Sequence, residues 1–85
     1  MNSFYIDDRR PQTVKLIVAP GSPLVGRKLG FLKEARQVTI LSHRRKNREA
    51  ELFPSEEVVL QVEDKVAVLG QSHVIGQLHA LNQPA

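Results

Sequence analysis

Short apolar runs alternate with polar breaks along the chain, a pattern that predicts several short strands and two helices. The first run, residues 14–19 (VKLIVA), is apolar and largely β-branched except for Lys15. Such a run is typical of a strand that is buried on one face and partly covered on the other. Pro20 and Gly21 follow it, and this pair predicts the end of the strand.

The next segment predicts a short helix. Ser22 followed by Pro23 is typical of a helix N-terminus, with serine as the capping residue and proline at the first helical position. Apolar positions then recur at the spacing of one helical face. These positions are Val25, Leu29 and Leu32.

Four further segments have the extended pattern of strands, and one more predicts a helix. The strands cover residues 38–42, 49–53, 58–62 and 66–69, with polar breaks at Pro54-Ser55 and Glu63-Asp64 and a closing Gly70. Ser72 is a candidate cap for the last helix, whose apolar face carries Val74, Leu78 and Leu81. The predicted order is β-α-β-β-β-β-α. We therefore expect a small α+β domain, in which a mostly antiparallel sheet packs with two short helices.

A basic run, SHRRKNRE, spans Ser42 to Glu49 and joins two of the predicted strands. If the first strand extends to Arg44, residues 45–48 form the link of a hairpin. Arg44 then lies opposite Glu49, and Ser42 lies opposite Glu51. An opposite-charge pair across a ladder contributes roughly 0.2–1 kcal/mol, so this pairing favours a hairpin over a nucleic-acid arm.

Length and composition describe one domain without membrane spans or disulfides. A chain of 85 residues buries roughly 60–65% of its unfolded surface, so its core is modest and dimerisation would stabilise it. There is no cysteine, no apolar run near the roughly 18 residues that a membrane span needs, and no signal-peptide pattern at the N-terminus. We assign residues 1–12 to a tail or linker, residues 13–82 to the domain and residues 83–85 to a second tail.

The net charge of +3 is unevenly distributed along the chain. Residues 27–48 contain eight Lys or Arg against the single acid Glu34, whereas residues 49–64 contain six acids and no Lys or Arg. If the two segments are neighbours in space, most of the basic field is cancelled locally. Nucleic-acid binding through bulk charge then loses its main support.

No catalytic or metal-binding pattern emerges from the remaining polar residues. The loop from Gly21 to Lys28 follows a predicted strand, but arginine stands where a phosphate-binding loop needs lysine, and lysine where it needs Ser or Thr. The three histidines lack metal-ligand spacing, and no nucleophile is paired with a base. We expect neither an enzyme nor a bound metal or cofactor.

Taken together, these motifs resemble the C-terminal subdomain of the regulators of potassium conductance, known as the RCK-C or TrkA-C domain. The resemblance extends from Val14 to Leu81 and rests on APGSPLVGRKL, a strand ending in HRR, and FPSEEVVLQVEDKVAVLG. The matching positions are Ser22, Gly26, Leu29, Arg44, Pro54, Leu60, Asp64 and Gly70. One position departs from the pattern, because Glu63 replaces the usual glycine before the aspartate. This turn must therefore have a different backbone preference or be strained.

The resemblance implies a dimeric regulatory domain of a cation channel, potassium uptake system or cation/proton antiporter, cytoplasmic and at the inner face of the membrane. Its partners would be a second copy and a membrane-embedded transporter. Several relatives bind a small effector at the dimer interface, cyclic di-AMP among them. For such an anion we expect a pocket with an apolar wall and guanidinium partners. The candidate residues are Leu24, Val25, Leu41, Arg44 and Arg45.

Two alternative functions remain open from the sequence. The first alternative to a ligand-binding module is a purely structural dimerisation domain whose interface holds no ligand. The second, which the compensated charge disfavours, is a nucleic-acid binder that uses the basic run. Adjacent strand residues point to opposite faces, so Arg44 and Arg45 are expected to differ, with only one of them free to meet a ligand.

Overall fold

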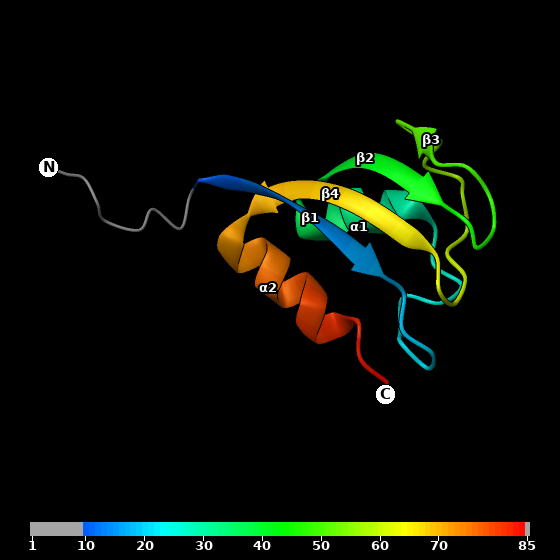
Figure 1. Cartoon of the computed structure of the whole chain (residues 1–85). Coiled ribbons are helices and arrows are strands. Elements are labelled where there is room, and N and C mark those ends of the chain that lie inside the picture. The colour runs from blue at the N-terminus through cyan, green and yellow to red at the C-terminus, as the bar shows by residue number, and fades with distance from the viewer. Residues whose placement is uncertain (1–9, 85) are drawn as a thin grey trace, which may run out of the picture.

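The computed structural model describes residues 10–84 and contains four strands and two helices (Figure 1). In chain order the elements are β1 (Pro11–Ile17), α1 (Leu29–Arg36), β2 (Thr39–Arg44), β3 (Glu51–Leu52), β4 (Lys65–Gln71) and α2 (Ser72–Leu81). Most of the predicted N-terminal tail, residues 1–9, lies outside the described residues, as does residue 85. Residues 11 and 12 of that predicted tail belong to β1.

All four strands form one antiparallel sheet in the order β1-β4-β2-β3. Strand β4 lies in the middle, where Val66, Val68 and Gly70 are buried and alternate with partly exposed residues. This alternation is the period of two that places successive side chains on opposite faces. The α+β fold class predicted from the sequence is confirmed.

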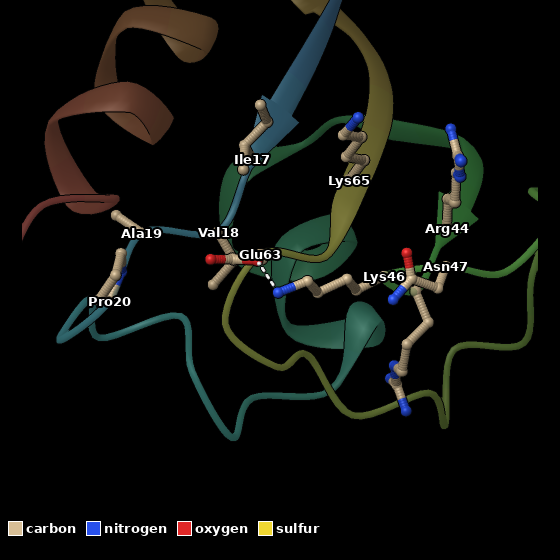
Figure 2. A pocket seen from close by; sticks show the side chains of 10 residues that line it. Ile17, Val18, Ala19, Pro20, Arg44, Lys46, Asn47, Glu63 and Lys65 are labelled. Carbon is tan, nitrogen blue, oxygen red and sulfur yellow. Dashed lines mark ion pairs between the residues drawn. The ribbon is translucent and has the colours of Figure 1, made fainter.

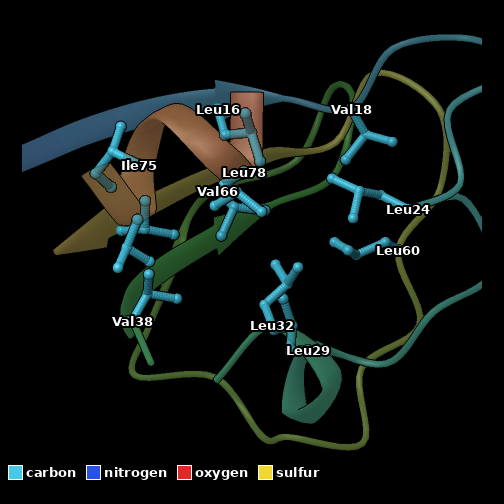
Figure 3. Packing of buried hydrophobic residues seen from close by; sticks show 12 residues of the cluster. Leu16, Val18, Leu24, Leu29, Leu32, Val38, Leu60, Val66, Ile75 and Leu78 are labelled. Atoms are coloured by element: carbon cyan, nitrogen blue, oxygen red, sulfur yellow. The ribbon is translucent and has the colours of Figure 1, made fainter. Parts of the chain in front are cut away.

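Both helices pack on one face of the sheet and enclose a single core (Figure 3). Helix α1 buries Leu29 and Leu32, and α2 buries Val74, Ile75 and Leu78. Facing them are inward side chains of the strands and of the segments between them, namely Leu16, Val18, Leu24, Val38, Leu60, Val66 and Val68. The opposite face of the sheet, called the open face below, carries no helix within residues 10–84.

Gly70 is needed for the close approach of the last strand to its neighbours. A Cβ atom at this position would lie 2.9 Å from Val38 Cγ1 and 3.5 Å from Ile75 Cδ1. The first distance is shorter than atoms tolerate, so a side chain here would push β4 away from the core.

The predicted start of the first helix is wrong. Helix α1 begins at Leu29, whereas Ser22 to Val25 form a turn in which Ser22 Oγ accepts a hydrogen bond from the Leu24 N–H at 3.0 Å. Serine favours such local turns as well as helix caps, so the sequence signal was ambiguous. Gly26 then adopts φ +87°, which interrupts any helix before Arg27.

The predicted strand over residues 58–62 is also absent, apart from an isolated bridge between Lys28 and Val59. Its backbone bonds to the segment before α1 and to the first helical turn instead. Val58 O and Glu56 O accept the N–H groups of Leu29 and Gly30 at 2.9 and 3.0 Å. This contact satisfies N–H groups that a helix leaves free at its start, and so removes the segment from the sheet.

The predicted β2–β3 register is wrong by one residue. Ser42 pairs with Leu52 and His43 with Glu51, rather than Ser42 with Glu51. The linking segment is longer than predicted, and it turns at Asn47, which has φ +62°. A shift of one residue moves each side chain to the other face, so the predicted ion pair between Arg44 and Glu49 does not form.

Helix α2 contains the three residues of the predicted apolar face, Val74, Leu78 and Leu81, but its cap differs. Ser72 is the first helical residue, and the N-cap is Gln71, with no hydrogen bond from its side chain. The Ser72 hydroxyl instead accepts a hydrogen bond from Gln12 Nε2 at 3.4 Å. The last turn ends at Asn82, whose N–H donates to Leu78 O at 3.0 Å.

Candidate functional site

A pocket of about 540 Å³ lies at one end of the sheet, where β1 ends, β4 begins and β2 leads into its loop (Figure 2). The residues on one side belong to β1 and the segment after it, and those on the other side belong to the β2 loop and the start of β4. They are Ile17, Val18, Ala19, Pro20, Arg44, Arg45, Lys46, Asn47, Glu63 and Lys65. Four of the ten are cations and one is an acid, so the pocket is basic.

The pocket continues the open face of the sheet. Directly paired residues share a face, and the pairs Ile17 with Lys65 and Lys65 with Arg44 therefore place these three side chains on it. Ala67 and Leu69 of β4 face the same way and are only partly exposed. No acidic residue occupies an outward register position of the four strands. The face is thus apolar in part and carries only positive charge.

Arg44 lies at the rim of the pocket, and within residues 10–84 only the Nε of its guanidinium group forms a hydrogen bond. Its Nε donates to the backbone carbonyl of Arg48 at 2.8 Å, which fixes the side chain through one nitrogen. Within residues 10–84, neither Arg44 nor Lys65 forms an ion pair with a carboxylate. The remaining donors of Arg44 and the Lys65 ammonium group are available to an anion, and a guanidinium group binds phosphate oxygens bidentately.

Arg45 has a structural partner instead. Its Nη2 donates to Asp64 Oδ2 at 3.2 Å and to the Val59 carbonyl at 2.8 Å, and its Nε lies 3.3 Å from Asp64 Oδ1. The same carboxylate accepts a hydrogen bond from the Gln61 N–H at 3.0 Å and lies 2.8 Å from His43 Nε2. The two arginines thus differ, as expected for neighbours at the end of a strand.

Asp64 is the centre of this cluster, and its side chain is 1% exposed. Burial by itself raises the pKa of the Asp64 carboxyl, but the hydrogen bonds from His43, Gln61 N–H and Arg45 outweigh it. The pKa of Asp64 therefore lies below its ordinary value. The carboxylate stays charged at neutral pH and holds the end of β2 against the turn before β4.

Glu63 crosses the pocket by an ion pair with Lys46, with Oε1 and Nζ 3.0 Å apart (Figure 2). Its backbone has φ +71°, the left-handed region that favours glycine. The departure from the family pattern at this position thus has the strained backbone that the sequence suggested.

Ion pairs link the basic and acidic segments of the chain, as the sequence suggested they would if the two were neighbours. Lys28 pairs with Glu57, Lys33 with Glu56, Arg45 with Asp64 and Lys46 with Glu63. Much of the positive field of residues 27–48 is therefore compensated, whereas Arg44 at the pocket forms no ion pair within residues 10–84.

The structure separates the candidate residues predicted from the sequence. Arg44 and Arg45 line the pocket, whereas Leu24 is fully buried in the core and Val25 lies exposed in the turn before α1. Leu41 is half-buried at an irregularity of β2 and does not line the pocket. In the described chain the apolar wall is formed instead by Ile17, Val18 and Ala19.

Sequence reasoning missed Lys65 and Ile17. Both were assigned to or near strands, but only the pairing of β1 and β2 with β4 brings them beside Arg44. Within residues 10–84 no group of three His, Cys, Asp or Glu side chains is placed to hold a metal ion. Neither helix there is long and apolar enough to cross a membrane.

Comparison with protein families identifies the chain. The model of the TrkA-C domain matches residues 14–83, nearly the whole domain. The chain belongs to the TrkA-C domain family. TrkA-C domains are regulatory rather than catalytic modules. A comparison with curated proteins found no match.

Two solved structures of BusR from S. agalactiae share the fold of this TrkA-C domain. The first is the RCK_C domain dimer of BusR in complex with c-di-AMP, with a TM-score of 0.70 and 18% identity over 81% of this chain and 86% of that one. The second is BusR in complex with its busAB-promotor DNA, with a TM-score of 0.69 and 17% identity. The TrkA-C domain aligns over 94% of its own length but only 38% of that second chain. At these identities the likeness extends to the fold alone.

Proposed function

We propose that this TrkA-C domain is a dimeric regulatory module that binds a phosphate-bearing effector, of the cyclic dinucleotide class, in the basic pocket. The observation that carries the proposal is the Arg44 guanidinium group beside Lys65, neither of them paired with a carboxylate within residues 10–84, at the end of a face whose four strands place no acid outward. Membership of a regulatory family supports it. So does the BusR domain, which shares the fold and is described as a dimer in complex with c-di-AMP.

The open face is the proposed dimer surface. Ile17 is 52% exposed and Leu52 is 73% exposed, and they flank the partly covered Ala67 and Leu69. Two such faces in contact would bury this apolar area. They would also bring together the cations of both copies, since the face carries Lys15, Arg44 and Lys65 but no acid. An anion at the interface offsets that repulsion, which supports an anionic ligand.

The proposed setting is a potassium or other cation transport system on the cytoplasmic side of the membrane, through a membrane-embedded partner. This part rests on the resemblance of the domain to the regulators of potassium conductance. Deleting the chain in its host and measuring potassium uptake at low external potassium tests it. The proposal predicts altered uptake, and wild-type uptake would contradict it.

Thermal unfolding with cyclic di-AMP, cyclic di-GMP and ATP tests the ligand. A ligand that binds only the folded state stabilises it by RT ln(1 + [L]/Kd), about 2.7 kcal/mol at a hundredfold excess over Kd. We expect a cyclic dinucleotide to raise the melting temperature of the wild type. No shift with any of the three would favour the structural alternative, a dimerisation domain without a ligand.

Sedimentation tests the dimer surface. Leu52→Glu places an acid on the open face, whereas Val62→Glu is a matched control on an exposed loop residue outside the sheet. We expect the wild type and Val62→Glu to sediment as dimers at tens of micromolar and Leu52→Glu as a monomer. Equal behaviour of the two variants would contradict this surface.

A further inference from the structure

The residue that follows α2 contacts the wall of the basic pocket. Asn82 follows the helix directly and is 7% exposed. Its Oδ1 accepts a hydrogen bond from the Ala19 N–H at 3.0 Å, and its Nδ2 donates to the Ile17 carbonyl at 2.6 Å. Ile17 and Ala19 both line the pocket. One side chain therefore joins the end of the helix to the pocket wall through two hydrogen bonds.

The other edge of the same segment is bound to the turn before β4. The Val18 N–H donates to Asp64 O at 2.9 Å, and the Glu63 N–H donates to Val18 O at 2.8 Å. The segment 17–19 is thus held from two sides, by a turn at Val18 and by Asn82 at Ile17 and Ala19. The carboxamide carries one acceptor and two donors, so it bonds here as an adjacent strand would.

We call the two hydrogen bonds from Asn82 to Ile17 and Ala19 the clasp. Few other side chains can form both bonds. A carboxylate keeps the acceptor for Ala19 but loses the donor for Ile17, and alanine loses both. The clasp is also well screened from water, because the Asn82 residue is almost fully buried. The two hydrogen bonds therefore fix the pocket wall and the last turn of α2 relative to each other.

We propose that Asn82 is a positioning residue, which fixes the wall of the basic pocket and transmits occupancy of the pocket to the C-terminal turn of α2. The proposal rests on the proposed ligand-binding function and adds the route by which binding reaches the end of the domain. Coupling between two sites is reciprocal in free energy. A ligand that orders the wall must protect the helix end, and loss of the clasp must weaken the ligand.

Hydrogen exchange on the full 85-residue chain tests the positioning role without ligand. Asn82→Ala is expected to expose the Ala19 amide to exchange, while the Val18 amide, bonded to Asp64 O, stays protected. Asn82→Asp retains the acceptor, so its Ala19 amide stays slower than in Asn82→Ala. Gln77→Ala, on the exposed side of α2, is the control and leaves both amides unchanged. Equal Ala19 exchange in all four proteins would overturn the clasp.

Cyclic di-AMP then serves as the probe for transmission. In the wild type we expect the probe to slow exchange of the Ala19 amide and of the Asn82 amide at the end of α2. In Asn82→Ala we expect the Kd of cyclic di-AMP to rise about 5-fold or more, which is the lower end of the range for allosteric coupling. We also expect that the probe no longer slows exchange of the amide at position 82. If Asn82→Ala does not fold, Asn82→Asp serves the same comparison.

The two possible failures are distinct. A wild type that binds neither cyclic di-AMP nor cyclic di-GMP would overturn the proposed function and the transmission with it, while ligand-free exchange still decides the positioning role. If the wild type binds cyclic di-AMP, and Asn82→Ala has the same Kd and the same ligand-induced protection of the amide at position 82, only the role of Asn82 is overturned.

Discussion

Replacing the buried Asp64, which lies next to the pocket residues Glu63 and Lys65, by alanine should destabilise the domain strongly. Its carboxylate is 1% exposed and accepts hydrogen bonds from His43, Arg45 and the Gln61 N–H. Alanine removes the shared acceptor and leaves two donors without a partner, the buried His43 ring N–H and the partly buried Gln61 N–H. Such unsatisfied donors are costly, because they have lost water as well.

The size of the loss follows from these contacts. Leaving a buried hydrogen-bond donor without its partner costs roughly 1–3 kcal/mol. The side chain of Arg45 is 37% exposed, so solvent screens its share, and most of the effect comes from the hydrogen bonds of His43 and Gln61. We therefore expect Asp64→Ala to lower the free energy of unfolding by about 3 kcal/mol, a large part of the roughly 5–15 kcal/mol typical of a domain.

Urea unfolding followed by circular dichroism measures this loss as a lower midpoint at unchanged slope. Glu63→Ala is the matched control, since it removes the adjacent acid but only an exposed ion pair with Lys46, worth less than about 1 kcal/mol. A loss below about 1 kcal/mol for Asp64→Ala, equal to that of Glu63→Ala, would refute the structural role given to the cluster.

Acid unfolding tests the charge state of the same group. The folded pKa of Asp64 lies below its ordinary value, so the stabilisation is fully present above the unfolded pKa of about 3.9 and is lost as the pH falls through the lower, folded pKa. In Asp64→Asn this part of the pH dependence disappears. Stability curves of the wild type and Asp64→Asn that stay parallel below pH of about 4 would contradict the lowered pKa.

Two further substitutions distinguish structural from strained residues around the pocket. Arg45→Ala should lower the free energy of unfolding by roughly 1–3 kcal/mol, because Asp64 and the Val59 carbonyl each lose a hydrogen-bond donor. The control Lys46→Ala removes only an exposed ion pair and should lower it by less than about 1 kcal/mol. Equal urea midpoints for the two variants would contradict this prediction. Glu63→Gly should stabilise the domain by up to about 1 kcal/mol relative to Glu63→Ala, because φ +71° is unfavourable for any residue with a Cβ atom. A lower melting temperature for Glu63→Gly than for Glu63→Ala would contradict the backbone strain at this position.

Local patterns in the sequence were enough to predict the elements with strong periodicity. Alternation in β4 and the helical spacing of Val74 and Leu78 reflect packing against one core, so both elements were found. Ser22-Pro23 led to a wrong predicted helix start. In the turn that they form, as at a helix N-terminus, the serine hydroxyl accepts a hydrogen bond from a backbone N–H. Residues 58–62 have a strand pattern but bond to the backbone around α1, a contact between distant segments that periodicity does not encode.

The candidate site was only partly predictable, for the same physical reason. Arg44 and Arg45 stood out because charged residues in a basic run are visible in sequence. Lys65 and Ile17 join them only through the strand order β1-β4-β2, which depends on how the chain closes its core. The apolar character of Leu24 predicted a place in the pocket wall. Apolar side chains are more often buried in the core, and Leu24 lies there.

Calorimetric titration of the chain with cyclic di-AMP tests the central claim most directly. We expect saturable binding by a dimer, with Kd raised roughly 10- to 100-fold by Arg44→Ala, the scale of a hydrogen bond to a charged group. Arg48→Ala is the matched control, since its backbone carbonyl still accepts the hydrogen bond from Arg44 and its side chain does not line the pocket. Absence of binding by the wild type, or equal affinities for the two variants, would contradict the account.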